Sequence, residues 1–170
     1  NVSGEVFAWG DNYWGQLADS TMDTTASHDA QTNDVSSSVS ALSGNTVIDV
    51  DAGADNTLVV TDSGTVLGFG WGTLGQNGDG LATERNYTPV TADFGSATVD
   101  IKAVSALGSV TLVTSENASG IDATIYTFGD DRYGQLGIGG SSETCTLGTA
   151  TVACAKQPTE VTGATDILIP

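Results

Sequence analysis

Three short segments of the sequence combine two or three glycines with a glutamine, a residue set suited to bonding buried backbone groups. They read GDNYWGQL, GWGTLGQN and GDDRYGQLG. A glutamine side chain offers one acceptor oxygen and two donor hydrogens, so it can replace the hydrogen bonds that water makes to peptide groups. We expect Gln16, Gln76 and Gln135 to bond backbone groups between neighbouring structural units. This structural role is favoured over ligand binding, because the same chemistry recurs at equivalent positions.

We expect the glycines of these segments to allow backbone conformations and contacts that other residues would prevent. A glycine that ends a strand adopts dihedral angles that other residues tolerate poorly, and a second glycine lets neighbouring backbones approach closely. Trp14, Leu74 and Tyr133 precede the second glycine, and we expect them to pack between the units. The residues assigned to this repeated motif are Gly10, Gly15, Gln16, Leu17, Gly70, Gly75, Gln76, Gly129, Gly134, Gln135 and Leu136.

Carboxylates offer a second chemistry, the binding of a hard cation. Calcium takes carboxylate and carbonyl oxygens from loops. The candidate ligands are Asp19, Asp23, Asp29, Asp34 and Asp79. Their spacing matches neither an EF-hand nor the repeated glycine and aspartate nonapeptide, and a solvated acidic surface is the alternative explanation. Calcium is the one cofactor that the sequence suggests.

Cys145 and Cys154 are the two cysteines, and they bracket eight residues in a segment rich in glycine and threonine. The spacing is not the C-x-x-C of zinc or redox sites. A disulfide that closes one loop fits best, with two free thiols as the alternative. Because disulfides persist in oxidising compartments, this pair favours an extracellular or cell-surface location.

Few residues could support catalysis. His28 is the only histidine, and it lies in a polar segment without a positioned nucleophile. Asp130 and Asp131 are adjacent acids, but sequence neighbours point different ways, and an aspartate in a turn commonly bonds the backbone. The glycines of GFGWGTLG are not followed by the lysine of a phosphate-binding loop. We therefore predict that the chain is not an enzyme.

The charge balance restricts the partners. The sequence has 21 Asp and Glu against 4 Lys and Arg, a formal net charge of -17. Binding to nucleic acid or anionic lipid depends on lysine and arginine, so we expect no nucleic-acid partner. No apolar run approaches the roughly 20 residues of a transmembrane helix, so we also expect no membrane insertion.

Short strands that recur along the chain must position the motif. Gly15, Gly75 and Gly134 are 60 and 59 positions apart. Each motif follows a run rich in β-branched and aromatic residues, which reads EVFAWG, TVLGFG or TIYTFG. A pair of short strands with a tight connection is expected upstream, in residues 47–64 and 100–120. With no amphipathic helix in the sequence, the repeat unit is a set of antiparallel strands, as in a propeller blade.

In these features the chain resembles the regulator of chromosome condensation repeat family, whose members build β-propellers, typically of seven blades. Gly15-Gln16-Leu17 and Gly134-Gln135-Leu136 match the Gly-Gln-Leu of that repeat, and Ala52-Gly53 matches its Ala-Gly. The departures are Asn77 in place of leucine, Ser105-Ala106 in place of Ala-Gly, and Asn56 and Ser109 where the family usually has histidine.

The resemblance implies an all-β fold, a β-propeller represented here by about three antiparallel blades. We expect one repeat domain over residues 1–170, with blades around 1–46, 47–98 and 99–166. Fewer than three full repeats cannot close a ring of the usual blade number, and open strand edges invite pairing. The chain is therefore expected to be part of a longer propeller or to close by assembly with copies of itself.

Long segments separate the motif from the next strand pair, at 18–46, 78–98 and 137–165. We expect them to be loops on one face of the propeller. The sequence thus predicts a non-enzymatic extracellular binding or adhesion module whose loop face contacts a protein or a glycan. The alternative is a structural subunit that assembles edge to edge into a ring, filament or sheath.

Overall fold

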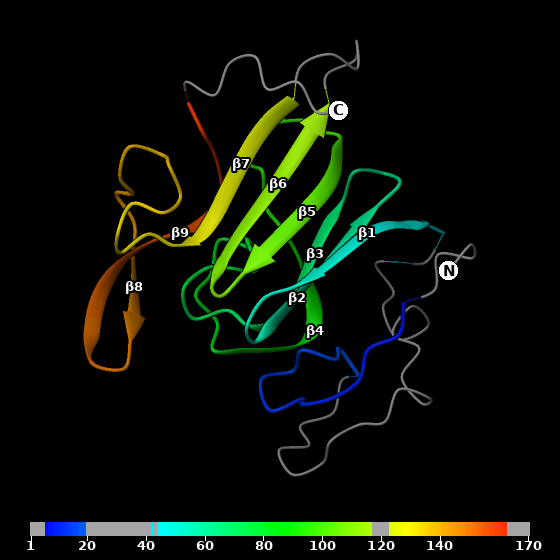
Figure 1. Ribbon diagram of the computed structural model, residues 1–170, viewed down its shortest axis with the longest axis horizontal. Coiled ribbons are helices and arrows are strands. Elements are labelled where there is room, and N and C mark those ends of the chain that lie inside the picture. Colours follow the sequence, from blue (N-terminus) through cyan, green and yellow to red (C-terminus); the bar gives the residue numbers. More distant parts are fainter. Residues whose placement is uncertain (1–5, 20–41, 43, 117–122, 163–170) are drawn as a thin grey trace.

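The computed structural model describes residues 6–19, 42, 44–116 and 123–162. Nine strands and no α-helix occur in these ranges, so no helix there could cross a membrane. The strands form two antiparallel sheets, with β1 of the first beside β5 of the second (Figure 1). The prediction of an all-β fold is confirmed.

The first sheet consists of consecutive strands in the order β1-β2-β3-β4. Its interior strands β2 and β3 are almost entirely buried, whereas β1 alternates half-buried and exposed positions. Continuous burial is expected of strands that pack on both faces. The strands are β1 (Val47–Ala52), β2 (Asn56–Thr61), β3 (Val66–Trp71) and β4 (Arg85–Thr91).

The second sheet has the order β5-β6-β7-β9-β8. The long strand β9 pairs with β7 through its C-terminal half and with β8 through its N-terminal half. The β8–β9 hairpin therefore extends this sheet outward (Figure 1). The strands are β5 (Ile101–Leu107), β6 (Val110–Glu116), β7 (Ala123–Asp130), β8 (Thr144–Leu147) and β9 (Ala150–Glu160).

Two of the segments predicted to be long loops contain strands instead. β4 lies within residues 78–98, and β8 and β9 lie within 137–165. These outer strands carry polar residues because much of their surface meets solvent, and Pro89 in β4 is typical of an edge strand. Most of the first predicted loop, 18–46, lies outside the described residues.

A hydrophobic core joins the two sheets. Leu58 and Val60 of β2 pack with Val113 of β6 and Phe128 of β7, and all four are fully buried. The opposite face of the first sheet packs Phe69 against residues 6–19, which we call the N-terminal segment. The first sheet thus has a neighbouring repeat on each face, as in a propeller.

Two carboxylates of β1 also connect the sheets. Asp49 Oδ2 accepts a hydrogen bond from Val104 N, and Asp51 Oδ2 accepts one from Ala106 N, both at 2.8 Å. Both donors lie on β5, the first strand of the next sheet. Alternate side chains of one inner strand therefore satisfy alternate amides of the following inner strand.

Candidate functional site

The repeated motif forms the same loop three times. Each loop has two successive turns, closed by backbone bonds from residue i+3 to residue i. In the middle loop, Gly75 N donates to Gly72 O and Gly78 N donates to Gly75 O, both at 2.9 Å. We call these the Gly-Gln loops, which are residues 12–18, 72–78 and 131–137.

The glutamine side chain closes each Gly-Gln loop from within. Gln16, Gln76 and Gln135 each accept, through Oε1, a hydrogen bond from the backbone N two residues earlier, at 2.9, 2.9 and 2.8 Å. The prediction that these side chains bond between blades is therefore wrong. The tight turn at the glycine brings an amide of the same loop within reach of the glutamine oxygen, so the bond is local.

The backbone carbonyl of the glutamine makes the bond between repeats instead. Thr57 Oγ1 donates to Gln16 O at 3.0 Å, and Thr111 Oγ1 donates to Gln76 O at 2.9 Å. Sequence reasoning missed these threonines. The sequence contained a signal for them, because each is the second residue of the second strand of its sheet, β2 or β6.

The second glycine of the loop allows close packing in two of the three copies. A Cβ added to Gly15 would lie 2.7 Å from Asn86 O of β4, and one added to Gly75 would lie 2.6 Å from Ala155 O of β9. At Gly134 no atom of the described residues would lie within 4 Å. In both copies that a described sheet follows, the second glycine therefore packs closely against the outer strand of that sheet.

This difference predicts unequal effects of the same substitution. All three glycines have positive φ, at which alanine costs about 1–2 kcal/mol. Gly75→Ala should cost about 1–3 kcal/mol more, because β9 must move. Urea unfolding should therefore show a larger loss of stability for Gly75→Ala than for Gly134→Ala. Equal losses would mean that another strand covers Gly134 in solution.

The residue before the second glycine packs between repeats in two copies. Leu74 is buried against Cys145 and Cys154, and the ring centroid of Trp14 lies 5.9 Å from that of Trp71. Tyr133 is 87% exposed, so the packing prediction fails there. No described sheet follows the second one, and this side chain therefore has no blade to pack against.

Asn77 departs from the repeat pattern, and Gly72 of the same loop departs from it as well. In the flanking loops, the side chains of Asn12 and Asp131 accept from the amides of Leu17 and Leu136, at 3.0 and 3.2 Å. Gly72 stands at that position in the middle loop, and a Cβ there would lie 2.8 Å from Asn77 Nδ2. The Asn77 side chain therefore occupies space that Gly72 leaves free.

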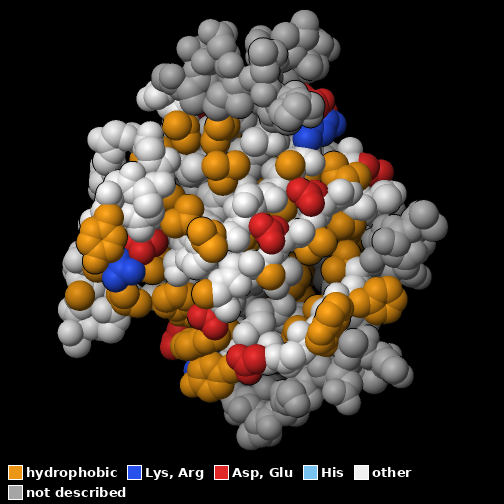
Figure 2. All heavy atoms as spheres, viewed as in Figure 1, with side chains coloured by type: hydrophobic (Ala, Val, Ile, Leu, Met, Phe, Trp, Pro, Cys, Tyr) orange, Lys and Arg blue, Asp and Glu red, His pale blue; other side chains and the backbone are white. Residues whose placement is uncertain are grey.

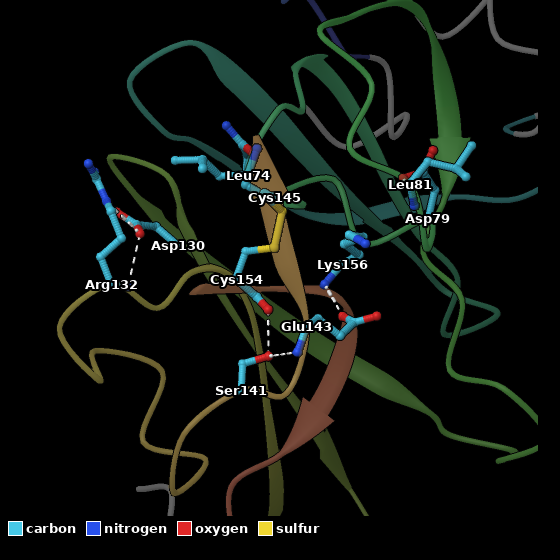
Figure 3. Close-up of a disulfide and its surroundings, with 11 residues drawn as sticks. Leu74, Asp79, Leu81, Asp130, Arg132, Ser141, Glu143, Cys145, Cys154 and Lys156 are labelled. Atoms are coloured by element: carbon cyan, nitrogen blue, oxygen red, sulfur yellow. Dashed lines mark hydrogen bonds and ion pairs between the residues drawn. A yellow bond between two sulfur atoms is a disulfide. The ribbon is translucent and has the colours of Figure 1, made fainter. Parts of the chain in front are cut away.

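The structure joins Cys145 and Cys154 in a disulfide, as the sequence predicts. The bridge ties β8 to β9 and is buried beside Leu74 of the middle Gly-Gln loop (Figure 3). Nearby, Glu143 Oε2 accepts from Lys156 N at 2.8 Å, so the hairpin carries polar cross-links as well. The disulfide therefore holds the outer hairpin in the position where it contacts the preceding repeat.

The candidate calcium ligands are not brought together. Asp19 accepts from Asn12 Nδ2 at 2.9 Å, and Asp79 accepts from Leu81 N at 3.2 Å in its own turn. Asp23, Asp29 and Asp34 lie outside the described residues, as does His28. In the part of the chain that the structure describes, no three Asp, Glu, His or Cys side chains form a group suited to a metal ion. Calcium binding stays a prediction.

The adjacent acids Asp130 and Asp131 have separate structural partners. Burial acts to raise the pKa of Asp130, but hydrogen bonds and charge from Arg132 outweigh it and hold that pKa below its usual range. The Arg132 guanidinium donates to both Asp130 oxygens, at 2.9 and 2.8 Å. Asp131 accepts from Leu136 N and Ser141 N. Both carboxylates therefore stabilise the third Gly-Gln loop.

A hollow of about 390 Å³ lies between residues 6–11 of the N-terminal segment and residues 50–57 of β1, β2 and their turn. Phe7 and Trp9 line it while 46% and 62% exposed, and Asp11 and Asp55 add carboxylates. Figure 2 shows hydrophobic side chains at the lower right of this face, where Figure 1 places the N-terminal segment. Sequence reasoning missed this surface, because it depends on which residues the described strands leave uncovered.

Together, the two sheets and their shared core define this chain as a segment of a β-propeller. The model of the family described as "Regulator of chromosome condensation (RCC1) repeat" matches residues 3–60, and a second model of that description matches residues 47–76. Residues 3–76 therefore match the repeat of the regulator of chromosome condensation family, the resemblance that the sequence predicts.

Solved structures of similar fold agree with the propeller architecture. Human WBSCR16 is 21% identical over 91% of this chain, with a TM-score of 0.58. Yeast RCC1 (Prp20) with Kap60 bound is 17% identical over 95%, with a TM-score of 0.68. A second structure of Prp20p from Saccharomyces cerevisiae is 16% identical over 94%, with a TM-score of 0.66. The chain spans only 34%, 34% and 35% of those three chains.

Proposed function

We propose that this chain is a non-catalytic protein-binding module, built on a propeller segment and displayed outside the cell. The observation that carries the proposal is the hollow beside β1, where the exposed rings of Phe7 and Trp9 adjoin the carboxylates of Asp11 and Asp55. Exposed aromatic side chains rimmed by polar groups are typical of protein interaction sites.

Two further observations support the proposal. Prp20, the yeast relative of similar fold, is described with Kap60 bound in one structure and with binding to Gsp1p and histones in the other. The buried disulfide between Cys145 and Cys154 suits an oxidising compartment, which supports an extracellular location.

Selection from a random peptide library tests the binding function. The folded chain, immobilised without reductant, should enrich convergent peptide sequences, and the same chain unfolded in urea should not. A matched selection against the Trp9→Ala variant separates peptides that use the hollow from those that bind elsewhere. Failure of the folded chain to enrich any convergent sequence would overturn the proposal.

Exposed residues on the second sheet favour a second candidate function, which is assembly with copies of the same chain. Tyr133 and Leu107 of this repeat are 87% and 84% exposed, and no atom of the described residues would lie within 4 Å of a Cβ added at Gly134. Light scattering distinguishes the two functions. A molar mass near 17.2 kDa at all concentrations supports a binding module. A mass that grows with concentration, and returns to that of the monomer in Tyr133→Asp, supports assembly.

A further inference from the structure

Arg85, the first residue of β4, stacks on aromatic side chains of the first Gly-Gln loop. Its guanidinium carbon Cζ lies 4.3 Å from the ring centroid of Tyr13 and 4.9 Å from that of Trp14. The Arg85 Nη1 atom donates a hydrogen bond to Tyr87 Oη at 3.3 Å. We call Tyr13, Trp14, Arg85 and Tyr87 the arginine cluster. Two cation–π contacts and one hydrogen bond therefore hold the guanidinium where the N-terminal segment meets β4 (Figure 1).

The charge of Arg85 is not neutralised by a neighbouring carboxylate. Two other cations of the chain are paired, since Lys102 lies 2.7 Å from Asp100 and Arg132 lies 2.8 Å from Asp130. In the described part of the chain, no carboxylate forms an ion pair with Arg85, although the sequence has 21 Asp and Glu. Hydrogen bonding to tyrosine hydroxyls raises the pKa of Arg85, but these groups are neutral. The cluster is therefore a positive site on a chain of formal net charge -17.

Arg132 shows which nitrogen atoms hold a carboxylate in this protein. Its Nε donates to Asp130 Oδ1 at 2.9 Å, and its Nη2 donates to Asp130 Oδ2 at 2.8 Å. In Arg85, among the described residues, Nε has no hydrogen-bond partner and Nη2 has no carboxylate partner. Nε is buried, so a carboxylate bound to both atoms would recover the free energy that its unsatisfied N–H costs. Tyr13 is 40% exposed, the most of the three rings, so a small movement of that ring can open Nε to a partner.

The surroundings of Arg85 decide which carboxylate fits. Arg85 covers one face of the Tyr13 ring and one face of the Trp14 ring, so a sugar cannot stack on those faces. Tryptophan, tyrosine and arginine are the residues that carry much of the binding energy at protein interfaces. The acidic surface of the rest of the chain repels a run of acidic residues. A peptide with one acidic residue between apolar ones is therefore favoured over an acidic sugar and over a polyacidic segment.

We propose that the arginine cluster binds a peptide segment in which a single glutamate or aspartate is flanked by apolar residues. The carboxylate accepts hydrogen bonds from Nε and Nη2 of Arg85, in the geometry by which Arg132 holds Asp130. The flanking apolar side chains contact the exposed part of the Tyr13 ring. None of the four cluster residues lines the hollow, so this is a second site and goes beyond the proposed function.

Two short peptides test the site. The probe is acetyl-Leu-Glu-Leu-amide, and the control is acetyl-Leu-Gln-Leu-amide, which has nearly the same size but no charge. The indole N–H resonances of the three tryptophans are followed by NMR during titration. The Trp14 resonance, assigned with the Trp14→Phe variant, should shift saturably with the probe, and the control should bind at least about tenfold more weakly. Acetate and glucuronic acid should also bind at least about tenfold more weakly than the probe.

Variants of the protein locate the binding. Arg85→Gln should weaken binding of the probe by about tenfold or more and remove the difference between probe and control. Arg85→Lys keeps the charge but not the paired N–H groups, so it should bind the probe more weakly than the unchanged chain does. Lys156→Gln is the matched control, because it removes the same charge from a lysine that forms no ion pair among the described residues. It should bind the probe as the unchanged chain does, and circular dichroism shows whether each variant is folded.

Equal binding of the probe and the control would overturn the proposal, and this comparison uses the unchanged chain, so it does not depend on the folding of any variant. Acetate bound as tightly as the probe would show a site for an adventitious ion only, and glucuronic acid bound as tightly would show a site for acidic sugars. Either result overturns the peptide partner. The proposed function fails separately. Convergent library peptides without a difference between probe and control would leave the binding module and remove this site, and a difference without convergent peptides would do the opposite.

Discussion

Phe128→Ala should lower the free energy of unfolding by about 3–5 kcal/mol, the largest effect expected of any single substitution discussed for this chain. Phe128 is fully buried in the core between the two sheets, where it packs with Leu58 and Val60. Its removal costs transfer free energy and leaves a cavity that the sheets cannot fill without separating. Urea unfolding monitored by circular dichroism measures the loss.

Trp9→Ala is the matched control, because Trp9 and Phe128 stand at the same position of the repeat. Trp9 is 62% exposed, so its removal should change the free energy of unfolding by only about 0.5 kcal/mol. A loss as large as that of Phe128→Ala would show that Trp9 is covered in solution. A small loss at both positions would contradict the shared core.

Cys145→Ala combined with Cys154→Ala should cost about 2–3 kcal/mol. The bridge closes a short loop, since its cysteines are nine positions apart, and cross-linking removes conformational freedom from the unfolded chain. If the β8–β9 hairpin also moves away from Leu74, the loss of stability should be greater than the entropy of the unfolded chain alone predicts. Differential scanning calorimetry of the variant and of the parent chain measures the change.

Reduction of the parent chain provides the control for this variant. Dithiothreitol should lower the melting temperature of the parent chain and leave that of the double alanine variant unchanged. An equal decrease in both would mean that the reductant acts elsewhere. No decrease in the parent would contradict a stabilising disulfide.

The architecture could be predicted because its sequence features recur along the chain. The glycine and glutamine motif returns at nearly constant spacing, and the runs that end at Gly70 and Gly129 carry the residues of strands. The outer strands β4, β8 and β9 could not be predicted in this way. Their outer surfaces meet solvent, so segments such as RNYTPVT have the polar composition of a loop.

The site was predictable only in part. The sequence correctly identified the disulfide of Cys145 and Cys154 but assigned the wrong bonding partners to Gln76. The partner of a flexible side chain depends on how tightly the loop turns, and the sequence does not report that distance. The hollow could not be predicted at all. Trp9 and Phe128 occupy the same repeat position, and only the packing of neighbouring sheets makes one exposed and the other buried.

Gly72 and Asn77 bear on how these repeats diverged from one another. The flanking loops have a polar side chain at the first position and leucine at the second, whereas the middle loop has glycine and asparagine. A side chain added at Gly72 alone would collide with Asn77, and leucine in place of Asn77 alone would leave an empty space beside Gly72. Either change by itself lowers stability. A side chain at Gly72 would also lie 2.8 Å from Thr83 O, so the double change requires a shift of that backbone as well. The two positions are therefore expected to be inherited as a pair, and recombination between repeats should preserve them only when its junction falls outside residues 72–77.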